Sequence, residues 1–448
     1  MSVRHYPAYK PSGIDWIDVL PSHWRSAPVW AVASCNDEVL REDTDPEQTI
    51  DYVEISDVNE VEGIRASTEM VFAEAPSRAR RVVRGGDVIV STVRTYLRAI
   101  AAVPHGRDGL IGSTGFAVFR PRTINAAYLA HLFHAEYLIA EIISRSTGVS
   151  YPAINASTIQ KLKVPLPPEP EQRAIAAFLD RETAKIDALI AEQERLIALL
   201  QEKRQAVISQ AVTKGLDPTV PMKDSGVEWI GLIPAHWNIA ALKFLADVQT
   251  GLAKGKDYGA AKTVNVPYLR VANVQDGYLN LDDVTTIEVL PEDVERYRLK
   301  IGDVLMNEGG DFDKLGRGDI WRGQIDPCIH QNHVFAVRPR NVSSEWLNLI
   351  TSALYAQQFF ISRSKQTTNL ASISSTNLME LPVVLPPALE QETILALVEK
   401  ARFEILRLIS ASETAVSLLR ERRAALISAA VTGKIDVREA GVKPAEAA

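Results

Sequence analysis

The chain has 448 residues, of which 46% are hydrophobic and 23% charged, and its formal net charge is −7. These values are ordinary for a globular protein with room for two domains and a substantial core. The negative charge argues against nucleic-acid binding only if it is spread evenly along the chain, and it is not. The sequence has no apolar signal core and no run of about eighteen apolar residues, which argues against secretion and membrane insertion.

The two cysteines, Cys35 and Cys328, lie far apart and lack the spacing of metal ligands. They offer no disulfide framework and suit a reducing compartment. We therefore expect a cytoplasmic protein that does not contact a membrane.

A tryptophan-containing segment near the start of the chain occurs twice. Residues 12–24 contain Ser-Gly-Ile-Asp-Trp-Ile and a later Pro-x-His-Trp, and residues 225–237 contain Ser-Gly-Val-Glu-Trp-Ile and the same Pro-x-His-Trp. These side chains could stack on nucleic-acid bases, or they could anchor the segment against a domain. Because the segment is nearly identical in both copies while the domains after it differ, we favour the anchoring role.

The correspondence continues through both halves of the chain. Gly86-Asp87-Val88 matches 302–304, and Arg-Pro-Arg at 120–122 matches 338–340. The offset drifts only from 213 to 219, so one unit is written twice. Short β-branched runs, such as 87–93 and 334–337, precede helical patterns at 126–144 and 344–362. This order predicts an α+β domain in each unit.

Charge changes sign abruptly in the first unit. From 36 to 74, thirteen acidic residues stand against two arginines, whereas from 76 to 107 seven arginines stand against one aspartate. Such a switch concentrates positive potential as a phosphate-contacting surface does, and arginine can also bind guanine with two hydrogen bonds. The alternative is that these arginines neutralise the acidic stretch before them. The candidate DNA-binding residues of this unit are Arg78, Arg80, Arg81, Arg94 and Arg98.

The second unit carries its cations in glycine-containing loops, at 251–256 and 314–318. Amide side chains in this unit are of the type that pairs with adenine edges. The first loop is one residue short of a phosphate-binding loop and is followed by Asp257, so we infer no nucleotide site there. The candidate DNA-binding residues of this unit are Lys254, Lys256, Asn307, Lys314, Arg317, Arg322, Gln331, Asn332, Gln366 and Asn369.

Each unit ends in a segment that predicts a long helix. Residues 166–215 begin Leu-Pro-Pro-Glu-Pro-Glu-Gln, and residues 385–434 begin Leu-Pro-Pro-Ala-Leu-Glu-Gln. Positions then recur at alternating steps of four and three, a 3.5-residue seam typical of paired helices. The seam includes Ile175, Leu179, Ile186, Leu189, Leu196, Leu200 and Val207 in the first segment, and Ile394, Val398, Ala401, Ile405, Leu408, Ser412, Ala415, Leu419, Arg422 and Leu426 in the second. The two seams can bury each other; the alternative is that each helix packs only on its own domain.

Signals of catalysis are missing from the sequence. No Cys/His set has zinc spacing, and no Gly-x-Ser-x-Gly motif or nucleotide-binding loop occurs. The Asn/Asp-Pro-Pro-aromatic motif of adenine methyltransferases is absent too. We therefore expect no catalytic, cofactor-binding or metal-binding residue in this chain.

The chain resembles the specificity subunits of type I restriction–modification enzymes over nearly its whole length. The resemblance rests on the repeated Leu-Pro-Pro-x-x-Glu-Gln with its long helix, the repeated tryptophan segment and the repeated Gly-Asp-Val. It implies an α+β fold with two similar target-recognition domains separated by two long helices, which form an antiparallel intramolecular coiled coil with pseudo-two-fold symmetry. It also implies a non-catalytic subunit that recognises a bipartite, asymmetric site in double-stranded DNA, with one half per domain.

The resemblance further implies the partners. Two methyltransferase (modification) subunits would bind around the helices, and motor-nuclease (restriction) subunits would join them. S-adenosylmethionine and ATP with magnesium would belong to these partners, and this subunit would need no cofactor. Since the arginine cluster of the first unit has no equivalent in the second, the two domains are not expected to use matched contacts.

The predicted boundaries follow from the repeat. They are 1–165 and 216–384 for the recognition domains, 166–215 and 385–434 for the spacer helices, and 435–448 for a polar tail. Two other functions stay open. One is a duplicated coiled-coil scaffold that joins two partner proteins without binding DNA, and the other is a DNA enzyme with an unrecognised active site.

Overall fold

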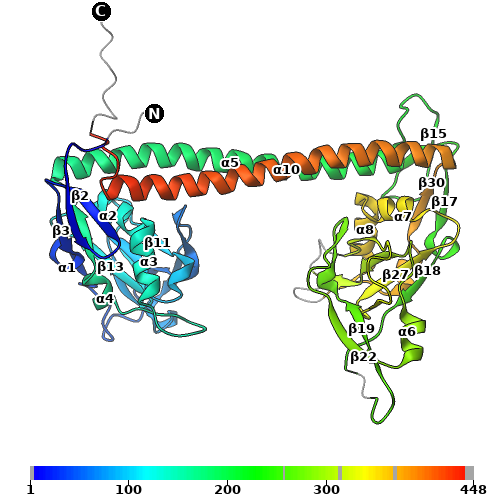
Figure 1. Cartoon of the computed structure of the whole chain (residues 1–448), viewed down its shortest axis with the longest axis horizontal. Helices are drawn as coiled ribbons and strands as arrows, with labels where there is room; N and C mark the ends of the chain where they lie inside the picture. Colours follow the sequence, from blue (N-terminus) through cyan, green and yellow to red (C-terminus); the bar gives the residue numbers. More distant parts are fainter. Residues whose placement is uncertain (1–4, 256–257, 311–314, 367–370, 439–448) are drawn as a thin grey trace, which may run out of the picture. The chain divides into compact units, whose positions relative to one another are not determined.

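The computed structural model describes residues 5–255, 258–310, 315–366 and 371–438. The chain forms two compact units (Figure 1), unit 1 from residues 1–194 and 413–448 and unit 2 from residues 195–412. Two long helices, α5 (Glu169–Lys214) and α10 (Ala388–Val431), each contribute to both units. The predicted long helices and the mixed helix-and-strand architecture are therefore confirmed.

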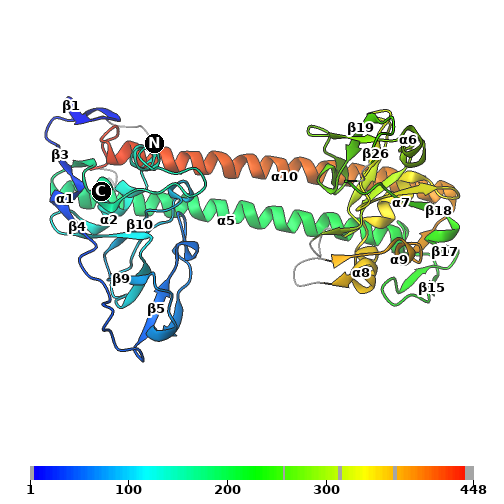
Figure 2. The same ribbon diagram turned by 90° about the horizontal axis from the view of Figure 1, so that it is seen from below.

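Two four-stranded sheets form the globular part of unit 1, with the orders β11-β10-β13-β4 and β8-β5-β12-β9. Strands β5 and β12 are parallel, with Tyr52 opposite Ile111, and the other pairs in these sheets are antiparallel. Figure 2 shows β5 and β9 projecting from the part of unit 1 that holds β4. The strands are β4 (Ala33–Cys35), β5 (Thr49–Val53), β8 (Thr68–Val71), β9 (Ala79–Val83), β10 (Val88–Ser91), β11 (Ile100–Ala102), β12 (Leu110–Ser113) and β13 (Phe116–Pro121).

The globular part of unit 2 repeats this plan. Its sheets have the orders β18-β27-β23-β25 and β22-β19-β26, and β19 and β26 are again parallel, with Tyr268 opposite Ile329. The predicted strands at 87–93 and 334–337 correspond to β10 and β27. The strands are β18 (Ala246–Thr250), β19 (Val264–Leu269), β22 (Thr285–Val289), β23 (Val304–Asn307), β25 (Gly318–Ile320), β26 (Ile329–His330) and β27 (Val334–Pro339).

The short remaining elements connect these sheets or cover their edges. They are the strands β6 (Val58–Asn59), β7 (Gly63–Ile64), β20 (Val274–Gln275) and β21 (Tyr278–Leu279), and the helices α1 (Val29–Val32), α4 (Ala156–Gln160), α6 (Pro291–Tyr297) and α9 (Ser375–Leu378).

Successive side chains of the central strands β10 and β23 point to opposite faces and belong to different hydrophobic cores. This explains why the sequences of these strands are almost entirely apolar. In unit 1, Val88 and Val90 of β10 join the core that contains the helices, whereas Ile89 joins a core with Val118 of β13. In unit 2, Met306 faces the helical core in the same way. Each central strand is therefore buried on both faces.

The predicted helices at 126–144 and 344–362 are each divided in two, which corrects the expectation of one element. The observed pairs are α2 (Ala126–Phe133) with α3 (Glu136–Ser144), and α7 (Ser344–Thr351) with α8 (Leu354–Arg363). Ala135 and Ala353 stand at the two breaks with extended backbone and are fully buried. A small residue at each break lets the second helix change direction while both helices stay on the core.

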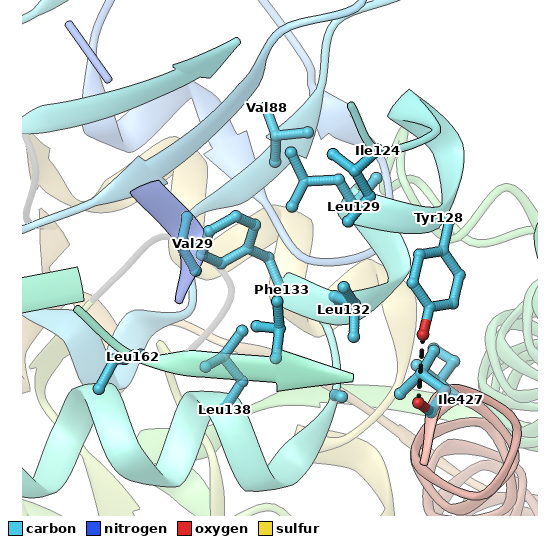
Figure 3. Packing of buried hydrophobic residues seen from close by; sticks show 14 of the residues in the cluster. Val29, Val88, Ile124, Tyr128, Leu129, Leu132, Phe133, Leu138, Leu162 and Ile427 are labelled. Atoms are coloured by element: carbon cyan, nitrogen blue, oxygen red, sulfur yellow. Dashed lines mark hydrogen bonds between the residues drawn. The ribbon is translucent and has the colours of Figure 1, made fainter. Parts of the chain in front are cut away.

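The core of unit 1 joins α2 to the last turns of α10 (Figure 3). Phe133 and Leu132 of α2 are fully buried in the same cluster as Ile427 of α10. The hydroxyl of Tyr128 points toward α10 and donates to the Val431 carbonyl at 3.3 Å. Helix α10 thus ends against the globular part of unit 1.

The repeated tryptophan segment is anchored in the domain core, as predicted, and it also holds the start of a long helix. In unit 1 it forms the hairpin of β1 (Tyr9–Ile14) and β2 (Ile17–Pro21). The next strand, β3 (Arg25–Pro28), pairs with β14 (Lys163–Leu166), which directly precedes α5. Trp24 is fully buried and donates its Nε1–H to Glu171 Oε1 at 3.1 Å. His23 Nε2 lies 2.9 Å from Glu171 Oε2. The glutamate of the first Leu-Pro-Pro-x-x-Glu-Gln motif is therefore held by the segment.

Unit 2 repeats the arrangement with β15 (Met222–Asp224), β16 (Leu232–Pro234), β17 (Asn238–Ala241) and β30 (Pro382–Leu385). Trp237 Nε1 donates to Glu390 Oε2 at 3.0 Å, and His236 Nε2 lies 2.8 Å from the same oxygen. The first tryptophan of each segment has a different environment, since Trp16 and Trp229 are 58% and 39% exposed. The anchoring role is thus confirmed for the second tryptophan only.

A glycine with positive φ follows each long helix, at 72° in Gly215 and 71° in Gly433. A Cβ atom on Gly215 would lie 3.1 Å from the Trp237 ring, and one on Gly433 would lie 3.3 Å from the Trp24 ring. Each buried tryptophan therefore contacts the start of one long helix and the end of the other. Both the backbone conformation and the close approach favour glycine at these positions.

The buried face of the long helices shares only part of the predicted 3.5-residue seam. The predicted residues Leu179, Leu200 and Val398 are buried. An eleven-residue spacing also marks this face. It includes Ile175, Ile186, Ile197 and Ile208 in α5, and Ile394, Ile405, Val416 and Ile427 in α10. The predicted seam residues Leu189, Leu196 and Leu408 are instead 52%, 41% and 48% exposed. In a straight helix seven and eleven residues each fall about 20° from a whole number of turns, so the eleven-residue pattern drifts less per residue.

Within each unit the two long helices run antiparallel. In unit 1, Asp187 pairs with Arg423 at 2.8 Å and Glu194 with Arg420 at 2.9 Å, so positions that ascend along α5 meet positions that descend along α10. In unit 2, the end of α5 adjoins the start of α10. No helix in the described part of the chain is both long and apolar enough to cross a membrane.

The repeated Gly-Asp-Val and Arg-Pro motifs form one buried ion pair in each unit. Asp87 is 1% exposed and accepts two hydrogen bonds of 2.9 Å from Arg120. Asp303 is fully buried and accepts two of 2.7 Å from Arg338. These repeated residues therefore stabilise the framework that both units share.

Candidate nucleic-acid interface

In each unit, several loops come together beyond the C-terminal end of the central strand, which is β10 in unit 1 and β23 in unit 2. In unit 1, Thr92 donates to the Gly115 carbonyl at 2.8 Å, and Ala153 forms bridges with both Val93 and Thr147. In unit 2, the same positions form a small sheet of β24 (Gly309–Gly310), β29 (Ala371–Ser372) and β28 (Lys365–Gln366). We call these regions the strand-end surfaces. They comprise residues 92–98, 113–115 and 146–153 in unit 1, and 307–310, 315–317, 330–333, 365–366 and 371–372 in unit 2.

Three of the predicted arginines of unit 1 lie at or beside its strand-end surface. The Arg78 carbonyl accepts from Thr114 N at 2.7 Å, and Arg94 and Arg98 follow β10 directly. By contrast, Arg80 and Arg81 lie within β9. The predicted arginines of unit 1 therefore lie in two separate places, the strand-end surface and strand β9.

Two of these arginines are neutralised by carboxylates. Arg78 forms an ion pair with Glu54 and donates to the Tyr52 hydroxyl at 3.1 Å. Arg98 binds Glu136 through hydrogen bonds of 2.5 and 2.9 Å. Arg98 also lies 3.6 Å from Glu60, so both arginines reach a carboxylate of the acidic stretch, as the alternative expects. Their contact with DNA stays a prediction.

The other three arginines have different surroundings. The guanidinium of Arg80 lies 4.8 Å from the centre of the Phe72 ring, and that of Arg94 lies 4.4 Å from the Tyr151 ring. The Nε of Arg81 is buried and has no hydrogen-bond partner among the described residues. Arg80 and Arg94 are therefore the cations of this set best placed to bind a phosphate.

Three predicted residues, Gln331, Asn332 and Gln366, lie in the strand-end surface of unit 2, and Lys254 lies beside it. Gln331 pairs with Leu252, which brings the loop of exposed Lys254 next to it. Asn332 Nδ2 lies 3.3 Å from His333 Nε2, and Gln366 is exposed in β28. The structure thus joins separate loops of the sequence into one polar surface.

Two further predicted residues belong to this surface but differ in how exposed they are. Asn307 is 4% exposed, and its amide donates to the Val274 carbonyl at 2.9 Å. Arg317 is half-buried, and its carbonyl accepts from Asn307 N at 2.9 Å. A base contact by Asn307 stays a prediction and is the least accessible one of the set.

Arg322 is not part of the surface. It follows β25 at the opposite end of β23 from Asn307, and it pairs with Asp319 at 3.2 Å. Lys256, Lys314 and Asn369 lie outside the described residues. No group of His, Cys, Asp or Glu side chains is placed to hold a metal ion within residues 5–255, 258–310, 315–366 and 371–438.

Sequence reasoning missed four residues of the strand-end surfaces. Tyr96 and Leu97 are 50% and 52% exposed between two of the predicted arginines. In unit 2, Glu308 Oε2 lies 2.8 Å from His333 Nδ1. Two large apolar residues inside a basic run were a usable signal for the first pair. Glu308 and His333 had no sequence signal, because they are distant in the sequence and only the pairing of β23 with β27 brings them together.

The long helices expose apolar side chains away from their shared seam. On α5, Leu189, Leu196 and Leu199 are 52%, 41% and 51% exposed, and their spacing of seven and three places them on one side of the helix. On α10 the exposed large apolar residues are Leu389, Leu397, Phe403, Leu406, Leu408 and Leu418. Grouped apolar residues of this kind are typical of a protein-binding surface.

Comparison with known proteins identifies relatives of the chain. A model of the type I restriction modification DNA specificity domain matches residues 36–198. The specificity subunit of the type I restriction enzyme EcoKI from Escherichia coli K12 is 25% identical, with 85% of this chain and 82% of the relative covered. The StySPI specificity subunit from Salmonella potsdam is 24% identical over 85% of this chain and 82% of the relative.

A solved structure agrees with these matches. It comes from work on complex assembly and conformational transition of the type I restriction–modification system. Its chain is 26% identical, with a TM-score of 0.67, and the comparison covers 93% of this chain and 99% of that chain. This chain is therefore similar to type I restriction–modification specificity subunits over most of its length.

Proposed function

We propose that the chain is a non-catalytic specificity subunit that recognises a bipartite, asymmetric DNA site, one half through each unit. One observation carries the proposal. The residues that the two halves share, such as Trp24 and Asp87 with their counterparts, serve the framework, whereas the strand-end surfaces differ. Two similar frameworks with different surfaces are suited to two different half-sites.

The two surfaces would use different chemistry. Unit 1 offers Arg80 and Arg94, which suit phosphate contacts that position the domain on the duplex. Unit 2 offers the amides of Gln331, Asn332 and Gln366, which suit hydrogen bonds to base edges. Unmatched contacts of this kind would give an asymmetric site.

The exposed leucines of α5 and α10 would bind two methyltransferase subunits, and motor-nuclease subunits would join that complex. The relatives named above are subunits of restriction enzymes, and the solved relative comes from work on assembly of such a system. S-adenosylmethionine and ATP with magnesium would bind those partners. The methyl transfer and the cleavage would also take place there.

The length of the two helices would set the number of base pairs between the half-sites, because a rigid helix pair keeps two reading domains in register. The recognition domains would comprise 1–165 and 216–384, and the spacers 166–215 and 385–434, as the repeat predicts.

Selection from a pool of random-sequence duplexes tests the proposal. The full chain, with its modification subunits, should enrich one sequence made of two fixed halves and a constant gap, and raised salt should weaken binding. No enrichment and no binding would contradict it. That result would favour a scaffold that joins proteins without DNA, an alternative that the ion pairs of Arg78 and Arg98 support.

A further inference from the structure

A strained turn follows the central strand of unit 1. Arg94 and Arg98 have φ values of 51° and 52° and flank the single turn η3 (Thr95–Leu97). Among the described non-glycine residues, only Asn36 shares this left-handed conformation. Bulky L-residues adopt it rarely, since Cβ approaches the backbone too closely. Such strain persists where surrounding contacts impose it, often at functional sites.

Contacts on both sides hold this turn in place. The backbone N–H of Arg94 donates to the Pro152 carbonyl at 2.7 Å. Thr95 is 5% exposed, and its hydroxyl lies 2.9 Å from that of Ser146. On the far side, two hydrogen bonds join the Arg98 guanidinium to Glu136. These contacts hold the turn on both sides.

This turn displays two neighbouring apolar side chains, Tyr96 and Leu97, which are 50% and 52% exposed. The segments 91–99 and 146–153 contain no aspartate or glutamate. The Arg94 guanidinium lies over the Tyr151 ring, and no carboxylate forms an ion pair with it in the part of the chain that the structure describes. The tip thus combines an apolar pair with an unneutralised cation, a combination that suits the stacked bases and phosphates of DNA.

We propose that this turn is a wedge that enters the DNA: Tyr96 and Leu97 insert at one base step of the half-site bound by unit 1, and Arg94 binds a neighbouring phosphate. The inference rests on the proposed function and adds a specificity element to it. Inserted apolar side chains unstack a step and kink the duplex. Because pyrimidine–purine steps unstack most easily, the wedge selects sequence without any hydrogen bond to a base.

Fluorescence of 2-aminopurine tests the wedge, since this base brightens when it loses its stacking neighbours. The probe is a duplex recovered by the wild-type complex from the random pool, with 2-aminopurine placed in turn along each half-site. Wild-type chain with its modification subunits should raise the signal at one step. The double variant Tyr96→Ala/Leu97→Ala should lose that rise and bind at least about tenfold more weakly.

Salt dependence separates the roles of the three side chains. The double variant should keep the wild-type slope of log affinity against log salt, because it removes no charge. Arg94→Gln should lower the slope by about one. Trp30→Ala is the matched control, because Trp30 is 61% exposed in α1 and should leave affinity, slope and fluorescence unchanged.

The outcomes distinguish the two proposals. If the wild-type complex binds no duplex, the proposed function fails and the wedge fails with it. If it binds but the double variant matches it in affinity and fluorescence, the wedge alone is wrong. If the double variant assembles less modification subunit, the turn contacts protein, which also overturns the wedge.

Discussion

Trp24 and Glu171 are 147 residues apart in the sequence, and the indole Nε1 of Trp24 donates to the Glu171 carboxylate at 3.1 Å. Tyr6 donates to the same carboxylate, and burial together with this contact raises the pKa of the Tyr6 hydroxyl well above its ordinary value. Glu171 therefore connects the chain start to the first turn of α5, and Glu390 repeats its contact with tryptophan in unit 2.

Glu171→Ala should lower the free energy of unfolding, because it leaves the buried donors of Trp24 and Tyr6 without an acceptor. We expect a loss of about 2–4 kcal/mol in urea denaturation, and a smaller loss for Glu171→Gln, which keeps one acceptor oxygen. Glu169→Ala removes a carboxylate that is 64% exposed on the same helical turn, and should cost no more than about 0.5 kcal/mol. Equal losses for positions 169 and 171 would contradict the anchoring role.

His330 should make unit 2 sensitive to acid. Burial lowers the pKa of this fully buried imidazole from 6.5 to about 4, although its Nδ1 lies 2.7 Å from the Val334 carbonyl. Above pH 6.5 the ring is neutral in the folded and the unfolded chain, so it contributes nothing to the pH dependence. Below pH 6.5 the unfolded chain takes up the proton first. The free energy of unfolding should therefore fall by about 1.4 kcal/mol per pH unit down to about pH 4.

Urea titrations between pH 7 and pH 4 check this prediction. His330→Gln should remove the contribution of His330 to the pH dependence of the free energy of unfolding. This holds whatever the substitution does to the stability at neutral pH. His333→Gln is the control, since this imidazole is 56% exposed. A slope that responds equally to both substitutions would mean that burial of His330 is not its source.

Arg80→Ala should weaken DNA binding and reduce its salt dependence. Arg80 packs on Phe72, whereas Arg84 pairs with Glu38 at 2.6 Å. Each arginine that binds a phosphate contributes about one unit to the slope of log affinity against log salt. Fluorescence anisotropy across a salt series should give a lower slope for Arg80→Ala and an unchanged slope for Arg84→Ala. The reverse order would assign the phosphate contact to the paired arginine.

Shortening both long helices by eleven residues should reduce the gap between the half-sites and leave the halves unchanged. Eleven residues are three turns, or about 16 Å, so the buried face stays in phase after the deletion. Selection from random duplexes would report the new site. A nine-residue deletion is the contrasting variant and should destabilise the helix pair, because nine residues are about two and a half turns and residues such as Ile405 would turn away from the contact. A changed half-site after the eleven-residue deletion would refute the spacer role.

The sequence predicted the elements that depend on identical residues in both copies. The repeat located both long helices and the anchoring tryptophans, because the same contacts must form twice. The predicted helix seam was wrong at Leu189, Leu196 and Leu408, which are exposed, and correct at Leu200 and Ile405, which are buried. Both Leu189 and Ile190 are apolar, and only packing against α10 decides that Ile190 is buried.

The candidate site was predictable only in part. The arginine run correctly located a charged region, but sequence does not show that Glu54 and Glu136 lie within reach of Arg78 and Arg98. The left-handed backbone of Arg94 also has no sequence signal, since arginine has no preference for it. Such features arise from contacts between distant segments.

The most direct test of the account is a map of methylated adenines in the source cell, with and without this chain. With the chain present, methylation should occur at one bipartite, asymmetric motif. Removal of the chain alone should abolish methylation at that motif while the modification subunit is still made. A methylation map that is the same in both cells would contradict the central claim that this chain supplies the DNA specificity.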